Sequence, residues 1–220
     1  MSAAIRRLLP NAITLSRLVL AGAFFAVLGG LVDEHMSTSR QWWGTVAVVL
    51  FVVAALTDAV DGWLARRWKV TSVFGRIMDP FVDKVLVIGA FVYLAGPALA
   101  RPEGAPPSGG FGTATSILPW MVVVVVAREL LVTSVRAVVE ASGQSFGADG
   151  WGKAKMILQS IAAPVSLFVA TRAWALENTI WLWLRDGFVW LAVGATAFSV
   201  VPYLTRAVRM LAPPADGTPP

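Results

Sequence analysis

The stretch "TDAVDGWLARRWKVTSVFGRIMDPFVDK", residues 57–84, places four aspartates in a very apolar chain: Asp58, Asp61, Asp79 and Asp83. On insertion scales, one charged side chain at the centre of a membrane-spanning helix costs about 2.5–3.5 kcal/mol. Four carboxylates beside or inside hydrophobic helices therefore need a strong functional reason, and the rest of the chain indicates what it is.

The composition is that of an integral membrane protein. The chain has 220 residues, of which 57% are hydrophobic and only 14% charged, and its mean hydropathy is +0.70. A soluble domain averages about 25% charged residues. The absence of cysteine excludes disulfides and thiolate metal sites. In so apolar a chain, the net charge of +5 indicates loops that face anionic lipids and anionic substrates rather than nucleic acid.

Six apolar spans predict an all-α membrane protein with six transmembrane helices in one bundle. The spans are 15–32, 43–64, 77–96, 117–135, 156–176 and 188–208. Residues 1–220 form one predicted domain. Residues 1–12 form an interfacial segment, with a short helix that ends at Pro10, and the Pro-rich tail 212–220 is predicted to be disordered. The Pro/Gly-rich connection between spans three and four is predicted to be a flexible loop.

Basic residues predict the orientation of the bundle. Of the 18 lysines and arginines, 14 lie on the N-terminal segment, the connections between spans two and three and spans four and five, the C-terminal end, or the helix ends that face them. The other four are Arg40, Arg101, Arg172 and Arg185. By the positive-inside rule, both termini and the aspartate stretch face the cytoplasm, and the protein lies in the cytoplasmic (inner) membrane as a multi-pass protein.

The spacing of the aspartates predicts a metal site. Asp58 and Asp61 share one helix face at i, i+3, and Asp79 and Asp83 share another at i, i+4. Because the connection between the two helices is short, the four carboxylates should converge, and such close like charges need a cation between them. Ligands that are all oxygen favour Mg²⁺, Mn²⁺ or Ca²⁺ over zinc. The alternative is that the aspartates are solvated loop-end charges paired with nearby arginines and lysines, but four carboxylates on two adjacent faces favour the site.

The same stretch resembles the signature of the CDP-alcohol phosphotransferase family, D-x-x-D-G-x-x-A-R followed after eight residues by G-x-x-x-D-x-x-x-D. This resemblance implies six membrane helices, a CDP-linked lipid donor, and one or two Mg²⁺ or Mn²⁺ ions on Asp58, Asp61 and Asp79. It implies that Asp83 is the general base that activates the acceptor alcohol. The residues expected to bind the CDP moiety are Asn11, Thr14, Gly62, Ala65, Arg66, Lys69 and Gly75.

For Asn11 and Thr14, in "PNAITLSR", an ordinary helix start with Asn11 as the cap and Arg17 snorkelling is an equally good interpretation.

A second stretch, "ARELLVTSVRAVVEASGQSFGADGWGKAKMILQ", predicts an anion pocket. Arg128 lies inside an apolar span, and an intramembrane arginine usually faces a polar cavity. The residues expected to bind the phosphate of the acceptor are Arg128, Arg136, Lys153 and Lys155. The alternative is that Arg128 only pairs with Glu129, Glu140 or an aspartate.

This second stretch resembles the branch of the family that forms phosphatidylglycerophosphate. The resemblance implies transfer of a phosphatidyl group from CDP-diacylglycerol to sn-glycerol 3-phosphate, with release of CMP, by a membrane-embedded homodimer. A sister transferase that uses inositol phosphate or phosphatidylglycerol is the alternative within the family. A divalent-cation transporter is the alternative from another class, and it predicts acidic residues deeper in several helices.

Overall fold

The computed structural model describes residues 3–32, 39–68, 73–100, 113–144 and 150–211. Within these ranges, the side chains of residues 3–14, 58–68 and 73–77, of Asp79 and of Ala100 lie outside the description. The described residues form helices and no strand. The helices are α1 (Ala3–Val32), α2 (Arg40–Trp68), α3 (Val73–Ala95), α4 (Pro97–Ala100), α5 (Pro119–Ala141), α6 (Gly150–Ala170), α7 (Ala173–Leu176), α8 (Thr179–Phe198) and α9 (Val200–Leu211).

The prediction of an all-α membrane protein is confirmed. Among the described residues, four stretches are long and apolar enough to cross a membrane: Leu15–Val32, Arg40–Thr57, Gly150–Ala170 and Thr179–Leu211. Helices α3 and α5 have 23 residues each but carry several charged residues. They are not among the four, and the count of six transmembrane helices stays a prediction.

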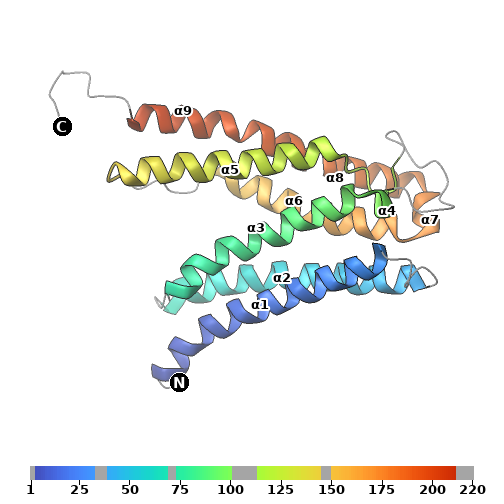
Figure 1. Cartoon of the computed structure of the whole chain (residues 1–220), viewed down its shortest axis with the longest axis horizontal. Coiled ribbons are helices and arrows are strands. Elements are labelled where there is room, and N and C mark those ends of the chain that lie inside the picture. Colours follow the sequence, from blue (N-terminus) through green and yellow to red (C-terminus); the bar gives the residue numbers. More distant parts are fainter. Residues whose placement is uncertain (1–2, 33–38, 69–72, 101–112, 145–149, 212–220) are drawn as a thin grey trace.

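The long helices run back and forth between two ends of the bundle (Figure 1). The first residues of α1, the last residues of α9, the connection from α2 to α3 and the connection from α5 to α6 all lie at one end, which we call the near end. Helices α4 and α7 lie at the opposite, far end. This arrangement places the aspartate stretch and both chain ends together, as the basic residues predicted.

One hydrophobic core joins the long helices. Phe24, Phe51 and Phe91, from α1, α2 and α3, are almost completely buried in it, and the rings of Phe24 and Phe51 meet edge to face with centroids 5.5 Å apart. Outside this core, large apolar side chains such as Trp183 and Leu130 stay exposed. Exposed apolar side chains on every long helix suit a bundle that is surrounded by lipid rather than water.

Small residues let two helix pairs approach closely. A Cβ atom at Gly44 of α2 would overlap the side chain of Thr171, which follows α6, and one at Gly89 of α3 would overlap the ring of Phe25 in α1. Glycine at these positions therefore brings α2 to α6 and α1 to α3, which is a common use of small residues in membrane bundles.

Helix ends differ from the predicted spans where charged residues extend a helix beyond its apolar part. The predicted break at Pro10 is wrong, because α1 is continuous from Ala3 to Val32. A proline inside a helix costs one hydrogen bond and a steric clash, but membrane helices tolerate it. Helices α3 and α6 likewise contain Pro80 and Pro164. The sixth predicted span begins nine residues too late, because α8 starts at Thr179. The preceding residue, Asn178, caps this helix: its side-chain oxygen accepts a hydrogen bond from Ile180 N.

Buried arginines fasten the far end. Arg185 has no exposed surface, and it donates hydrogen bonds to the carbonyl oxygens of Thr113 and Ala114 at 3.1 and 2.8 Å. Arg172 donates to Thr45 Oγ1 in α2 at 2.6 Å, and Arg40 donates to the Ala98 carbonyl at 3.0 Å.

The connection between spans three and four, which was predicted to be a flexible loop, is partly ordered. It includes α4, and residues 113–117 are buried. Residues 101–112 and the predicted disordered tail, 212–220, lie outside the described residues.

Candidate active site

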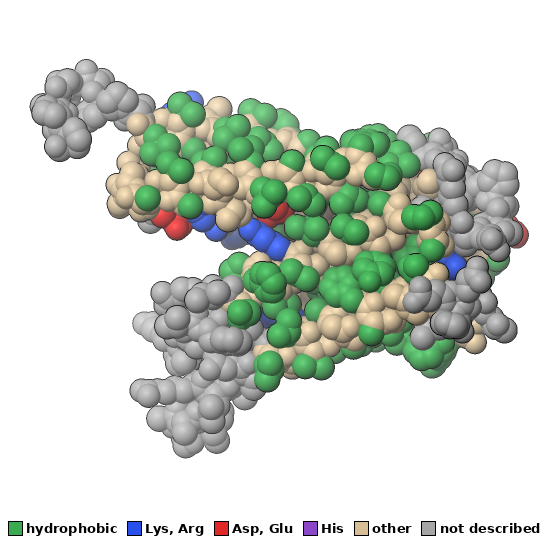
Figure 2. Space-filling view, in the orientation of Figure 1, with side chains coloured by type: hydrophobic (Ala, Val, Ile, Leu, Met, Phe, Trp, Pro, Cys, Tyr) green, Lys and Arg blue, Asp and Glu red, His purple; other side chains and the backbone are tan. Residues whose placement is uncertain are grey.

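At the near end the helices separate into two groups, with a hollow between them (Figure 2). Helices α1, α2 and the start of α3 lie on one side, and α5, α6 and α9 lie on the other (Figure 1). Lysine, arginine and acidic side chains gather in the hollow. Helix α2, which carries Asp58 and Asp61, ends here, and α3, which carries Asp79 and Asp83, begins here. The backbone thus brings the helix segments that carry the two predicted sites to the same end of the bundle.

Asp83 is held by a buried arginine. Arg17 of α1 has no exposed surface, and its Nη1 lies 3.3 Å from Asp83 Oδ1. The Asp83 side chain is 22% exposed, so solvent still reaches the carboxylate. The interpretation that Arg17 snorkels to the interface is wrong, because Arg17 is turned into the bundle. The charge of Arg17 stabilises the ionised form of the Asp83 carboxylate and fixes its orientation.

Four basic residues form what we call the cation cluster: Lys84, Arg128, Arg136 and Lys155. They come from α3, α5 and α6, and their positive charges act on one another, since Arg136 and Arg128 repel Lys84, and Arg128 and Lys84 repel Lys155. Arg128 and Lys155 are buried. Three of the four residues predicted to bind the acceptor phosphate are therefore together. The fourth, Lys153, has an exposed side chain and lies two residues before Lys155, about half a turn away on α6.

Glu129 lies at the centre of the cation cluster. Its Oε1 accepts a hydrogen bond from Arg128 Nη1 at 3.1 Å and another from Lys155 Nζ, and its Oε2 lies 3.9 Å from Lys84 Nζ. The pairing of Arg128 with Glu129, which the alternative interpretation named, is thus present. It does not exclude an anion pocket, because Glu129 is one carboxylate beside several cations.

A second layer of polar groups orients Arg128. Its Nε donates to Ser199 Oγ at 2.9 Å, and Ser199 lies at the junction between α8 and α9 and is completely buried. Nearby, Gln159 Nε2 donates to Thr196 Oγ1 at 2.8 Å, and both residues are buried. The sequence analysis missed Ser199, Gln159 and Thr196. Their signal in the sequence is weak, since single polar residues in apolar helices are common.

The cation cluster also contains a buried donor that has no acceptor. Within the described part of the chain, Arg136 Nε is buried and makes no hydrogen bond. Arg40 and Arg185 at the far end also have such a nitrogen, so this feature agrees with a ligand in the hollow but does not by itself indicate one.

Most of the predicted CDP and metal ligands cannot be placed at the level of side chains. Lys69 lies outside the described residues, and the other such positions have only their backbone described: Asn11, Thr14, Asp58, Asp61, Gly62, Ala65, Arg66, Gly75 and Asp79. Among the side chains that the structure describes, no three acidic or histidine residues converge on a metal position. The aspartate ligand set stays a prediction.

The structure also contains an apolar groove between two of the long helices. It has a volume of about 620 Å³ and runs between α2 and α6. Its lining includes Leu56, two residues before Asp58, and Met156, the residue after Lys155. The groove thus reaches the same helix turns of α2 and α6 that carry Asp58 and Lys155.

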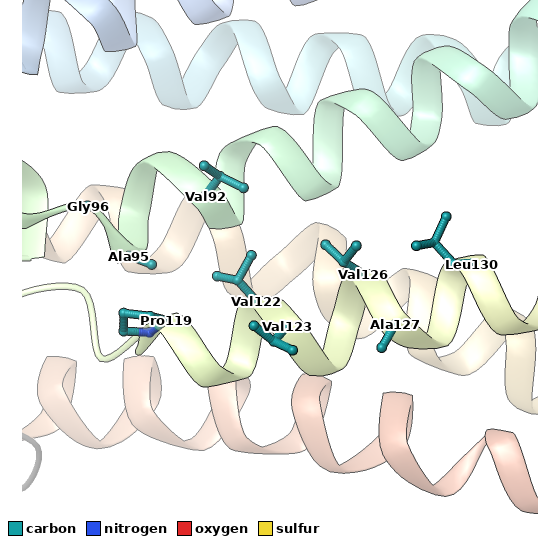
Figure 3. A pocket seen from close by; sticks show the side chains of 9 residues that line it. All are labelled: Val92, Ala95, Gly96, Pro119, Val122, Val123, Val126, Ala127 and Leu130. Atoms are coloured by element: carbon teal, nitrogen blue, oxygen red, sulfur yellow. The ribbon is translucent and has the colours of Figure 1, made fainter.

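A second apolar groove, of about 490 Å³, lies between α3 and α5 (Figure 3). Val122, Val126 and Leu130 of α5 point toward α3 and Val92. No charged side chain lines this groove, so it offers no chemistry of its own.

Comparison with known proteins gives the class of protein to which this site belongs. The model of the CDP-alcohol phosphatidyltransferase family matches residues 7–200, which include every predicted site residue, and the chain belongs to this family. The resemblance seen in the motif is confirmed.

Three similar proteins are named for one reaction within this family. The CDP-diacylglycerol–glycerol-3-phosphate 3-phosphatidyltransferase of Bacillus subtilis is 32% identical over 163 residues, which cover 72% of this chain and 76% of the relative. A probable phosphatidylglycerophosphate synthase of Mycobacterium tuberculosis is 31% identical, over 91% of this chain and 82% of the relative. The 3-phosphatidyltransferase of Salmonella paratyphi A is 30% identical, over 90% and 94%.

Proposed function

We propose that this protein transfers the phosphatidyl group of CDP-diacylglycerol to sn-glycerol 3-phosphate and releases CMP. The observation that carries the proposal is the cation cluster beside Asp83, in a chain whose relatives are named for this reaction. Several cations around one small hollow suit an acceptor that bears a phosphate, and do not suit serine, choline or ethanolamine.

The chemistry requires one new bond and one broken bond. The acceptor hydroxyl oxygen attacks the phosphorus of the phosphatidyl group, the bond from that phosphorus to the CMP oxygen breaks, and the hydroxyl proton leaves. Asp83 is the group that we assign to take this proton, because it lies on α3 one residue before Lys84 and is still reached by solvent. The cation cluster holds the acceptor phosphate, so that its hydroxyl faces Asp83.

We assign a divalent metal to Asp58, Asp61 and Asp79. Three carboxylates in a chain without cysteine form a donor set of oxygens only, which suits Mg²⁺ or Mn²⁺. When bound, such an ion neutralises charge on the diphosphate of the donor. The basic and small residues that accompany the aspartates, including Gly62 and Arg66, are proposed to bind the CDP moiety.

The groove between α2 and α6 supports a lipid donor. Its apolar lining ends beside the positions of Asp58 and Lys155, which is the arrangement that a diacylglycerol with a charged head requires. We propose that the acyl chains leave the hollow through this groove into the bilayer, whereas the acceptor reaches the hollow from the cytoplasm. The proposal that the hollow faces the cytoplasm, in the cytoplasmic membrane, rests on the distribution of basic residues.

We also propose that the protein acts as a homodimer, which rests on the family resemblance. Cross-linking in native membranes, followed by mass measurement of the purified protein in detergent, tests it, and a protein that stays monomeric in both would contradict it.

Release of CMP by the purified protein tests the proposed function. With CDP-diacylglycerol and Mg²⁺, we expect release with sn-glycerol 3-phosphate and none with serine. Release only with inositol phosphate or phosphatidylglycerol would make the protein a sister transferase. The absence of metal-dependent CMP release with every acceptor would refute transfer, and uptake of Mn²⁺ into vesicles would then favour the transporter.

We expect Arg136→Ala to weaken binding of the acceptor selectively. The substitution removes a charge-assisted contact worth about 1.5–3 kcal/mol, which raises the acceptor KM about ten- to a hundredfold at roughly 1.4 kcal/mol per decade. Arg136→Lys should recover only part of the loss, because a point charge does not reproduce a planar fork. The measurement is KM for sn-glycerol 3-phosphate and for CDP-diacylglycerol, determined separately.

Arg209→Ala is the matched control, because Arg209 is an exposed arginine in the last turn of α9. It should change neither KM. An Arg136→Ala variant that loses affinity for the donor but not for the acceptor would overturn the assignment of Arg136 to the phosphate.

A further inference from the structure

Glu129 occupies the position in the cation cluster that an anionic ligand would be expected to take. Its Oε1 is shared by a guanidinium nitrogen of Arg128 and the ammonium of Lys155, which come from two different helices. The side chain is only 11% exposed. An oxygen held jointly by an arginine and a lysine in a buried place is bound as a phosphate oxygen is bound. The acceptor phosphate and the Glu129 carboxylate therefore compete for the same donors.

The structure also contains a second place for the displaced carboxylate. Glu129 Oε2 lies 3.9 Å from Lys84 Nζ, which is too far for a good hydrogen bond. Lys84 instead donates to Thr133 Oγ1 at 2.7 Å, and Thr133 is one turn further along α5. A change of rotamer at Glu129 toward Lys84 would release Arg128 and Lys155 and keep the carboxylate paired.

We propose that Glu129 is an internal anion that fills the acceptor pocket when it is empty and is displaced by the incoming phosphate. This inference rests on the proposed function for the identity of the pocket. Because Glu129 is attached to the chain, its effective concentration at the cations is high. A ligand with a single negative charge gains little by replacing it, whereas a phosphate monoester brings two charges and three oxygens. A monoanion therefore does not bind the cations tightly enough to displace the Glu129 carboxylate.

This competition would keep phospholipid head groups out of the cation cluster. The hollow opens beside a bilayer whose phospholipid head groups are phosphodiesters, and each phosphodiester carries a single negative charge. Without an internal anion, these head groups would occupy the cation cluster at the high local concentration of the membrane. With Glu129 present, the pocket binds phosphate monoesters but not phosphodiesters or carboxylates.

The test is anion binding to the purified full-length protein in detergent, at about pH 8 where a phosphate monoester is doubly charged. The probes are sn-glycerol 3-phosphate, inorganic phosphate and the monoanion dimethyl phosphate, and the readout is Kd from calorimetry without the lipid donor. For Glu129→Gln we expect the Kd of each dianion to fall about tenfold, which corresponds to roughly 1.4 kcal/mol. Binding of dimethyl phosphate, which should be undetectable for the natural protein, should become measurable.

Glu140→Gln is the matched control, because it removes an exposed carboxylate from the same helix outside the contacts of Glu129. It should leave every Kd unchanged. Glu129→Asp keeps the charge and is the second variant if Glu129→Gln does not fold. Its shorter side chain does not reach the Oε1 position, so the affinity for dianions should again rise. A weaker affinity for phosphate in either variant would overturn the proposal and make Glu129 a residue that only positions the cations.

The anion measurements need no turnover, so the two proposals fail separately. If the natural protein releases no CMP with sn-glycerol 3-phosphate, but Glu129→Gln binds phosphate more tightly, the proposed function fails and the internal anion stands. If the natural protein catalyses the transfer, but Glu129→Gln binds phosphate less tightly, the reverse holds.

Discussion

Replacing Asp83 by asparagine is expected to reduce turnover by about 10²–10⁴-fold, the usual effect of removing a general base. Binding of CDP-diacylglycerol should change little, because the donor is assigned to the other three aspartates and to Arg66. Asparagine keeps the shape of the side chain and an oxygen that accepts the hydrogen bond of Arg17, so the contact between α1 and α3 is preserved. The measurements are kcat for CMP release and, separately, the affinity for the lipid donor.

The charge of Arg17 requires a control in this experiment. Asp83→Asn keeps the hydrogen bond but removes the negative charge that faces Arg17, and loss of one charge of a buried pair destabilises a protein by up to about 3–5 kcal/mol. Asp83→Glu keeps the ion pair and moves the carboxylate by one methylene, so it should retain stability and still lose most of the rate. Equal losses of donor binding and of rate in Asp83→Asn would instead make Asp83 a metal ligand.

Replacement of Asp58, Asp61 or Asp79 by asparagine is expected to abolish turnover in each case. An amide loses the negative charge that holds a hard dication, and the remaining two carboxylates then bind the ion too weakly to keep the donor diphosphate in place. Each variant should also bind Mn²⁺ more weakly, which electron paramagnetic resonance measures without any substrate.

Glu177→Gln is the control for loss of a carboxylate, because Glu177 is exposed at the far end of the bundle beside α7. It should alter neither turnover nor Mn²⁺ binding. An aspartate variant that keeps near-normal activity at low metal concentration would show that its residue is not a ligand.

The general layout of the protein is readable in the sequence because it depends on patterns within single helices. Apolar spans located the long helices, and the uneven distribution of basic residues placed both chain ends and the aspartate stretch at one end. The spacing of Arg128 and Arg136 along one helix face predicted part of the cation cluster. Membership of the family followed from eight fixed positions within residues 58–83.

Contacts between helices are what the sequence did not reveal. Arg17 could be placed at the level of the aspartates, but whether it turned outward or toward Asp83 depended on how α1 packs against α3. Ser199 and Lys84 became parts of the site only through partners 71 and 49 residues away. Pro10 was expected to end a helix, because local sequence does not show what the surroundings of a membrane helix tolerate.

The arginines at the far end have a consequence for the membrane itself. A hydrated cavity that crossed the bilayer would conduct protons and ions, and each elementary charge that moves through 100 mV releases about 2.3 kcal/mol. In the described part of the chain, Arg185, Arg172 and Arg40 tie the helices and the segment 113–114 together at the end opposite the hollow. Their guanidinium groups satisfy backbone carbonyls there and add a positive electrostatic barrier. If the hollow at the near end binds metal and phosphates as proposed, these contacts at the far end would keep the potential across the membrane from being dissipated through the bundle.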